Sequence, residues 1–496
     1  MTINGISLDK EQLDIVYDNS NYLLVVAGAG SGKTLTILGK INYLVNKKNI
    51  KPEEIICISF TNEAANNLKN KLNQMNLDIK TYTFHKLGLL FLKNKYQIAD
   101  PTTLENIVNN FFKIDILYNN KMLKAILSYF NLKTKEEYIK LYKTSYEYIY
   151  ELEKLVITFI KLFKCNNYKL EDFNKFLKKS KNIFNIKNYK TEKNLLILIL
   201  NIYIEYEDYL KENNEIDFDD MLIKSSKEVY NTKTKYIIID EYQDTSYVRF
   251  NLIKNLINKT NAKLMVVGDD FQSIYRFTGC DLELFTNFKN YFDKTKIKYI
   301  SNTYRNSNEL IQIAGNFIMK NKNQIKKDLK SNIHIDKPIV VVRYKNKKDL
   351  KKLIQEIYQK NKEILILGRN NADIEKYLDS DFTYKNNTIT YKKNKNIKIK
   401  YLTIHKSKGL ESDDVIIINL YNKTLGFPNK MKDDKILRFV TKTKIKYPYD
   451  EERRLFYVAL TRTKNKVYLF TPLNSSIFVN ELIEDYKDKI EFRKIY

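Results

Sequence analysis

The chain has 496 residues, 43% of them hydrophobic, which is enough for about two to four domains with buried cores. Its net charge of +27 favours a polyanionic partner; AT-rich coding could explain many of the lysines but would not remove the resulting field. The three cysteines lie far apart, no signal peptide is seen and no apolar run reaches membrane length, so we expect a cytoplasmic protein without disulfides, zinc ribbon or membrane span.

The first chemical motif is a glycine-rich loop between a strand pattern (22–26) and a helical pattern (35–44). In this context backbone N–H groups at a helix N-terminus surround phosphate oxygens. Lys33 would reach the β- and γ-phosphates of a nucleotide, and the Thr34 hydroxyl would bind Mg²⁺. An ordinary turn is the alternative for a lone glycine-rich loop, and Ala27 stands where the strict pattern has Gly. The loop consists of Ala27, Gly28, Ala29, Gly30, Ser31, Gly32, Lys33 and Thr34.

Short apolar runs alternate with helical patterns in two regions, which predicts two parallel α/β cores. The runs of the first region are residues 23–26, 55–60, 236–239 and 264–267. Those of the second are residues 339–342, 364–367, 401–404, 415–420 and 467–470. Between them, segments 385–398 and 421–448 are polar and are interpreted as loops or small insertions.

A long segment inside the first region differs from the rest. Residues of about 95–215 show almost no strand signal and carry apolar side chains at helical spacing, as in Tyr146, Ile149 and Leu152. They predict an all-helical insertion within the first core.

The second chemical motif follows this insertion. Three isoleucines (237–239) predict a buried strand that ends in Asp240 and Glu241. Behind a phosphate loop, Asp240 would bind Mg²⁺ and Glu241 would lie beside the attacking water. A surface acidic pair after a core strand is the alternative, and it is weak once both motifs are present.

Further motifs, in order and spacing, resemble the UvrD/Rep family of superfamily 1 DNA helicases, and most nearly its helicase IV-like branch. The motifs are Ser-Phe-Thr-Asn (59–62), Thr-Phe-His (83–85), Val-Gly-Asp-Asp-Phe-Gln-Ser-Ile-Tyr-Arg-Phe (267–277), Thr-Tyr-Arg-Asn (303–306), Thr-Ile-His-Lys-Ser-Lys-Gly-Leu-Glu (403–411) and Glu-Glu-Arg-Arg-Leu-Phe-Tyr-Val-Ala-Leu-Thr-Arg (451–462). The resemblance covers nearly the whole chain.

The resemblance implies an α/β fold with two RecA-like parallel-sheet cores of the P-loop NTPase type. The first core would comprise residues 1–95 and 216–285, the helical insertion 96–215, and the second core 286–496. The chain departs from the family in Ser412, where Phe is usual, and in Phe277, where many members have Trp. Only a short polar segment precedes Thr403, where larger relatives insert a helical subdomain, so that subdomain is expected to be short or absent.

The resemblance also assigns an ATP site between the cores. Gln12 would read the adenine edge and Tyr304 would stack on it, while Glu411 would contact the ribose. Arg305 and Arg462 would act as arginine fingers on the γ-phosphate. Gln272 would link that phosphate to the DNA site. Without the motifs, Gln12 would be read as a surface residue and each arginine as half of a surface ion pair. The catalytic set is therefore Lys33, Asp240, Glu241, Gln272, Arg305 and Arg462.

For DNA, the family positions of Phe60 and Phe277 imply stacking on single-strand bases; burial in the core is the alternative for either. Sugar and backbone contacts are implied for Thr61, Asn62, Thr83 and His85, and a coupling role at the DNA site for His405.

The function implied by the resemblance is an ATP- and Mg²⁺-dependent 3′→5′ DNA helicase or translocase on single-stranded DNA and single/double-strand junctions. A second hypothesis is a translocase subunit that works with a repair, replication or nuclease partner. We expect a monomer or weak oligomer in the cytoplasm, at the nucleoid. A metabolite kinase or other P-loop switch is a third hypothesis, disfavoured by the paired arginines and the stacking phenylalanines.

Overall fold

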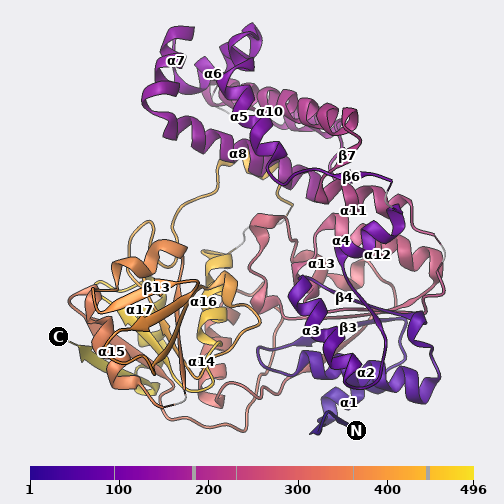
Figure 1. Cartoon of the computed structure of the whole chain (residues 1–496), viewed down its shortest axis with the longest axis vertical. Helices are drawn as coiled ribbons and strands as arrows, with labels where there is room; N and C mark the ends of the chain where they lie inside the picture. Colours follow the sequence, from indigo (N-terminus) through magenta and orange to yellow (C-terminus); the bar gives the residue numbers. More distant parts are fainter. Residues whose placement is uncertain (94, 181–185, 231, 361, 443–446, 496) are drawn as a thin grey trace.

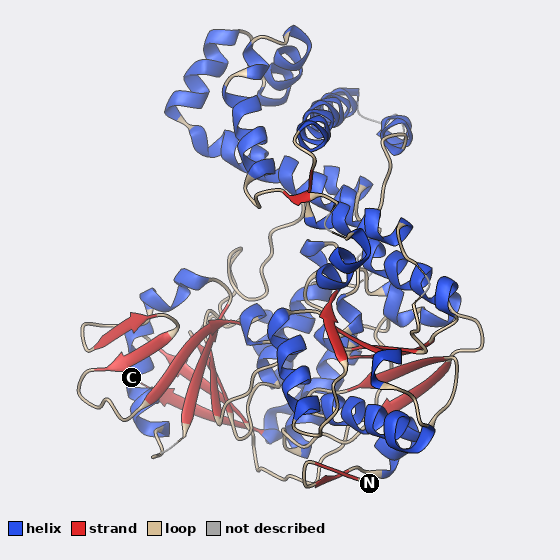
Figure 2. Ribbon diagram, turned by 45° about the vertical axis from the view of Figure 1, so that its right-hand side comes forward, coloured by secondary structure: helices blue, strands red, loops and turns tan. Residues whose placement is uncertain are grey.

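The computed structural model describes residues 1–496 apart from 94, 181–185, 231, 361, 443–446 and 496. Figure 1 shows two α/β lobes side by side, with a helical region above the lobe that contains the N-terminus. In Figure 2 most strands form two separate groups, one in each lobe, and a short strand lies at the foot of the helical region. The prediction of two parallel α/β cores with a helical insertion is confirmed.

The first core is a six-stranded sheet in the order β10-β3-β9-β8-β4-β5, and every neighbouring pair is parallel. Its strands are β3 (Tyr22–Ala27), β4 (Ile55–Ser59), β5 (Lys80–Thr83), β8 (Tyr236–Ile239), β9 (Lys263–Gly268) and β10 (Lys296–Ile300). Its main helices are α1 (Lys10–Tyr17), α2 (Lys33–Lys48), α3 (Asn62–Asn73), α4 (Phe84–Leu92), α11 (Phe218–Lys227), α12 (Tyr247–Thr260) and α13 (Glu283–Thr286). The central strands are buried because apolar clusters lie on both faces of the sheet. A small ribbon, β1 (Thr2–Ile3) with β2 (Ile6–Ser7), precedes α1.

The boundary predicted between the cores at residues 285 and 286 is corrected by β10. This strand pairs in parallel with β3, so the first sheet extends to Ile300. Its sequence alternates lysine with apolar residues, as is common for an edge strand, and it therefore lacks the continuous apolar run of a central strand.

The insertion is helical, as predicted, and is joined to the first core by a short parallel pair of β6 (Gln97–Ile98) and β7 (Glu215–Ile216). Its helices are α5 (Thr103–Lys113), α6 (Asn120–Phe130), α7 (Lys135–Thr144), α8 (Tyr146–Cys165), α9 (Asp172–Ser180) and α10 (Ile186–Glu212). They share one apolar core of their own.

The second core is an eight-stranded sheet in the order β13-β14-β15-β12-β16-β17-β11-β18. Its strands are β11 (Ile339–Tyr344), β12 (Glu363–Gly368), β13 (Phe382–Lys385), β14 (Thr388–Tyr391), β15 (Lys398–Thr403), β16 (Asp414–Ile417), β17 (Val467–Thr471) and β18 (Ile490–Ile495). Its helices are α14 (Asn308–Met319), α15 (Leu350–Ile357), α16 (Asp450–Leu460) and α17 (Ile477–Tyr486).

Two segments interpreted as polar loops contain structure. Within 385–398, strand β14 pairs antiparallel with β13 and β15 and extends the second sheet; its Ile389 and Tyr391 are buried, an alternation too short to stand out in a polar segment. This hairpin stands where the larger relatives were expected to insert a helical subdomain. Within 421–448, a short 3-10 helix, η10 (Lys435–Phe439), packs on the helical insertion.

Candidate active site and nucleic-acid interface

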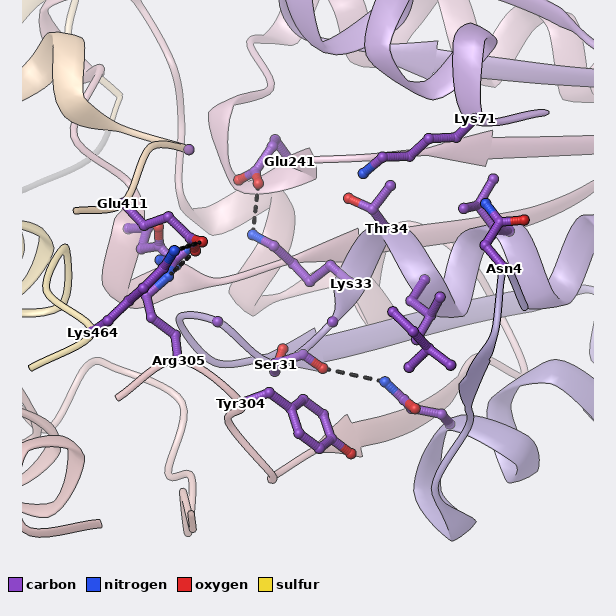
Figure 3. A pocket seen from close by; sticks show the side chains of 18 of the residues that line it. Asn4, Ser31, Lys33, Thr34, Lys71, Glu241, Tyr304, Arg305, Glu411 and Lys464 are labelled. Atoms are coloured by element: carbon purple, nitrogen blue, oxygen red, sulfur yellow. Dashed lines mark hydrogen bonds and ion pairs between the residues drawn. The ribbon is translucent and has the colours of Figure 1, made fainter. Parts of the chain in front are cut away.

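A cavity of about 780 Å³ lies between the two cores, and the sequence motifs line it from both sides (Figure 3). Most of the residues predicted for the nucleotide and its chemistry reach this cavity: Gln12, Gly30, Ser31, Gly32, Lys33, Thr34, Glu241, Gln272, Tyr304, Arg305, Glu411 and Arg462. Ala27, Gly28, Ala29 and Asp240 are not in its lining; they lie at the ends of the strands β3 and β8 behind it.

The glycine-rich loop is held against the segment that leads into the second core. Gly30 and Gly32 have φ angles of 69° and 79°, which glycine adopts without strain. Thr303 Oγ1 donates to the Ala29 carbonyl at 2.7 Å and the Tyr304 N–H donates to the Gly30 carbonyl at 3.0 Å. A Cβ on Gly30 would lie 2.6 Å from Cβ of Arg305, so only glycine allows this approach. The backbone that carries Arg305 is thereby fixed to the loop.

Lys33 begins α2 and turns toward the end of β8. Its Nζ lies 2.6 Å from Oε1 of Glu241. Burial lowers the pKa of Lys33, but the Glu241 and Asp240 carboxylates outweigh burial and raise it above its usual range. Burial raises the pKa of Glu241, yet Lys33 and Lys408 outweigh it and hold that pKa well below its usual range. Asp240 behaves in the opposite way, because burial and the adjacent Glu241 carboxylate raise its pKa.

Gln272 connects the first core with the second. Its Nε2 donates to Oδ2 of Asp269 at 2.6 Å, and its Oε1 accepts from Arg462 at 3.1 Å. Arg462 is 1% exposed and also donates to the carbonyls of Val458 and Leu410. Burial, reinforced by the neighbouring Arg305, lowers the pKa of Arg462 to about 9, so it stays cationic at neutral pH.

Arg305 and Glu411 are brought together at the cavity wall. Arg305 Nε donates to Oε2 of Glu411 at 2.7 Å, and Lys464 lies 3.0 Å from the other carboxylate oxygen. Figure 3 shows these side chains side by side, across the cavity from Lys71. Both Arg305 and Glu411 thus have protein partners here, and a bound nucleotide would compete for them.

Gln12 and Tyr304 lie at the far end of the cavity. Asp9 and Gln12 form a capping box that fixes the start of α1, and Nε2 of Gln12 reaches the Ser31 carbonyl at 3.4 Å. The Tyr304 hydroxyl donates to Asp9 at 2.6 Å, while the residue as a whole remains 55% exposed. An exposed ring beside a fixed amide can stack on a planar base and read its edge.

The residues present fit a nucleotide with Mg²⁺. Within the described residues, the buried Ser31 Oγ has no hydrogen-bond partner, and it lies in the loop that would surround phosphate. A cation beside Asp240 would relieve the raised pKa of that carboxyl. The described part of the chain holds no cluster of three or more His, Cys, Asp or Glu side chains able to bind a metal alone. Mg²⁺ does not need one, because it usually takes one or two carboxylates with phosphate oxygens and water.

The residues predicted to contact DNA from the first core line one groove. This groove has a volume of about 480 Å³ and contains Phe60, Thr61, Asn62, Thr83 and His85. Thr61 and Thr83 are the N-caps of α3 and α4, and their hydroxyl oxygens accept from backbone N–H groups at 3.1 and 3.3 Å. Their hydroxyl hydrogens remain available to donate to a phosphate.

Phe277 and His405, both predicted to act at the DNA site, lie together. Phe277 is 59% exposed, and its ring meets His405 edge to face at 5.6 Å between centroids. Tyr275 links the two halves of this surface, since its ring is parallel to Phe60 at 5.9 Å and its hydroxyl donates to the His405 carbonyl at 3.1 Å. Burial, with nearby Arg369, lowers the pKa of His405 to about 4, so its ring is neutral at physiological pH.

Several charged residues of the site had not been predicted. Lys71 and Lys464 line the cavity, and Lys408 bridges Asp244 and the Gln272 carbonyl. Lys327 is buried against Asp269 and Asp270, 2.6 Å from the latter. Lys408 lies inside one of the motifs and could have been predicted as a site residue. The other lysines lie outside the motifs, and only the fold distinguishes them from surface lysines.

Comparison with known proteins gives two domain matches and several relatives. Residues 8–293 match the UvrD/REP helicase N-terminal domain, and residues 381–473 match the UvrD-like helicase C-terminal domain. The "ATP-dependent DNA helicase Rep" of Buchnera aphidicola subsp. Baizongia pistaciae is 28% identical over 76% of this chain and 50% of its own length. The "Probable DNA helicase II homolog" of Mycoplasma capricolum is 30% identical over 74% of this chain and 49% of its own length. "DNA helicase IV" of Escherichia coli is 28% identical over 96% of this chain and 70% of its own length. The chain thus spans about half the length of the first two relatives. Among the described helices, none combines the length and apolar character of a membrane span.

Proposed function

The chain belongs to the UvrD/Rep helicase family, and from that premise we propose that it is an ATP-dependent DNA translocase and helicase. It would hydrolyse ATP with Mg²⁺ between its two cores and move 3′→5′ along single-stranded DNA. One observation carries the proposal: Lys33 and Glu241 from the first core line the same cavity as Arg305 and Arg462 from beyond it. Groups from two bodies around one phosphate site make hydrolysis depend on how those bodies are placed.

The ion pair between Lys33 and Glu241 provides a starting state for the reaction. Lys33 is 2.6 Å from Glu241, which keeps that carboxylate a poor base. Nucleotide phosphates would take Lys33 as their partner, and the pKa of Glu241 would then rise toward the range that a general base requires. Mg²⁺, held by Thr34 and Asp240, would supply positive charge to the phosphate oxygens. Glu241 would then orient and deprotonate the attacking water.

Arg305 and Arg462 would stabilise the charge of the transferring phosphoryl group. Arg462 already contacts Gln272, so loss of the γ-phosphate would change the contacts of the segment that leads from Gln272 to Phe277. Release of that phosphate removes the anion shared by the two cores, and they can separate. Repeated closing and opening would advance the aromatic surface of Phe60 and Phe277 along the bases.

The substrate proposed is single-stranded DNA and its junctions with duplex, in the bacterial cytoplasm at the nucleoid. The net charge of +27 favours the phosphate backbone, and the exposed Phe277 offers a face that accepts any base.

The direct test is steady-state ATP hydrolysis with single-stranded DNA, duplex DNA and RNA as activators. We expect single-stranded DNA to stimulate turnover most, and Lys33→Ala to abolish turnover while still binding the strand. Lys47→Ala, an exposed lysine of the same helix, is the matched control and should behave as the parent. ATP turnover that no nucleic acid stimulates would contradict the proposal. So would transfer of the γ-phosphate to a small molecule.

A further inference from the structure

One segment of the second core leaves it and enters the core of the helical insertion. We define residues 428–442 as the strap; they follow Phe427, which is buried in the second core. Ile436, Phe439 and Val440 of the strap are buried among the apolar side chains of the insertion. In Figure 1 the chain of this colour rises from the second lobe to the underside of α8.

Polar contacts fix the strap at the insertion. Arg438 donates from both terminal nitrogens to the two carboxylate oxygens of Glu192 on α10, at 2.7 and 2.6 Å. Asn166, 4% exposed at the end of α8, donates to the Val440 carbonyl at 2.9 Å. The ring centroids of Phe439 and Phe176 lie 5.6 Å apart. The bidentate Arg438–Glu192 pair and the buried Asn166 amide fix the strap in one position, which a loose attraction between surface charges would not do.

The other end of the strap is tied to the segment between the ATP site and the DNA surface. Arg276 donates to Asp433 of the strap at 2.7 Å and to Glu451 of α16 at 3.2 Å. Arg276 immediately precedes Phe277 and follows Gln272 by four positions. A change in how Gln272 meets Arg462 therefore arises four residues from Arg276, which binds Asp433 of the strap.

The insertion is also held by the first core. Nζ of the buried Lys164 on α8 lies 2.7 Å from Asp217 and 2.9 Å from Asp220, both at the start of α11. The insertion is thus continuous with the first core at β6 and β7 and is held by the second core through the strap. When the cores move relative to one another, either the joint with the first core deforms and the insertion moves with the second core, or the strap detaches.

We propose that the strap is a positioning element for strand separation: it holds the helical insertion to the second core, so that ATP-driven movement of that core also moves the insertion. Arg438 and Phe439 are its positioning residues, and neither lines the ATP cavity or the DNA groove. This inference rests on the proposed helicase function and adds the route by which the ATP site acts on duplex DNA.

The test reverses the Arg438–Glu192 pair in the full chain. Arg438→Glu and Glu192→Arg should each lower duplex unwinding by roughly tenfold, a typical coupling between sites, while the double variant regains most of it. ATP hydrolysis stimulated by single-stranded DNA should stay within about twofold of the parent in all three, since the reversed charges lie outside the ATP cavity and the DNA groove. Lys161→Glu is the matched control, because its exposed pair with Glu105 lies wholly within the insertion.

A second readout follows position directly. Dyes on Tyr118→Cys in the insertion and Leu473→Cys in the second core, 82% and 74% exposed, report their distance by energy transfer, and the native cysteines are buried. The parent should show one narrow distribution that shifts with ATP analogues; Arg438→Glu and Phe439→Ala should broaden it, and the charge swap should restore it. An unchanged distribution and normal unwinding in Arg438→Glu would overturn the inference. Failure of single-stranded DNA to stimulate the parent's ATP hydrolysis would instead refute the proposed function.

Discussion

Arg305 and Arg462 differ in what holds them, although both line the ATP cavity. Arg462 is buried and bonded to Gln272 and two carbonyls, so its position is set before any nucleotide binds. Arg305 is held by Glu411, a carboxylate that is 42% exposed in its side chain. A phosphate could replace Glu411 as the partner of Arg305 with little rearrangement, whereas Arg462 stays bound to Gln272.

Alanine substitutions separate these roles. Arg305→Ala and Arg462→Ala should each lower kcat for ATP by about 10³-fold, the low end of arginine-finger effects. Arg462→Ala should additionally uncouple turnover from single-stranded DNA, because Gln272 loses its partner from the second core. Steady-state kinetics with and without DNA measures both. A change confined to KM would show that these groups bind only ground-state ATP.

Phe277 has the exposure expected of a binding residue and not of a core residue, at 59%. Phe277→Ala should raise the DNA concentration needed for half-maximal ATP hydrolysis, since base stacking is worth about 1–3 kcal/mol. Turnover without DNA should be unchanged. Phe492→Ala, a 47% exposed phenylalanine on the edge strand β18, is the matched control. If Phe277→Ala lowered thermal stability and all activities together, the stacking role would be wrong.

At the level of elements, the central strands and the motifs at their ends could be predicted, but the edges could not. Strands β4 and β8 are apolar runs buried on both faces, and the carboxyl ends of parallel strands gather at one edge of a sheet. That rule is why Lys33 and Glu241 could be placed together from sequence. Strands β10 and β18 alternate charged with apolar residues, because they lie at sheet edges, and no continuous run marks them.

The strap shows a second limit of sequence reasoning. Its apolar residues stand among lysines and aspartates without helical or strand period, so they read as part of a polar loop. Their burial depends on partners far away in the chain; Arg438 and Glu192 are 246 positions apart. Lys327 was missed for the same reason, since only the fold brings it to Asp269 and Asp270.

The root of the helical insertion depends on one lysine. Lys164 lies between Glu207, Asp217 and Asp220, at 2.6–2.9 Å, with 4% of its side chain exposed. Lys164→Ala would leave the mostly buried Asp217 and Asp220 carboxylates without this counter-charge and should lower the free energy of unfolding by about 3–5 kcal/mol. Thermal and denaturant unfolding measure the loss. Lys154→Ala, in an exposed pair on the same helix, should cost less than about 1 kcal/mol; equal losses in both variants would contradict the structural role of Lys164.

At the scale of the whole molecule, two α/β cores share one cavity and carry aromatic residues on the face that is proposed to bind DNA. The Tyr275 hydroxyl, which donates to the His405 carbonyl at 3.1 Å, and the strap both connect parts that are proposed to move relative to one another. The net charge of +27 makes binding of a polyanion strongly dependent on salt, while the stacking contacts should depend on it less. Movement along a strand is therefore the proposed property that would distinguish this protein from a nucleotide switch that merely binds DNA.

The measurement that tests this most directly is displacement of streptavidin from single-stranded oligonucleotides biotinylated at one end. A 3′→5′ translocase should release streptavidin from the 5′-labelled strand, only with ATP and Mg²⁺, and should leave the 3′-labelled strand occupied. Lys33→Ala should release neither. No displacement from either end, despite ATP hydrolysis stimulated by single-stranded DNA, would contradict translocation, and preferential release from the 3′ end would contradict the proposed direction.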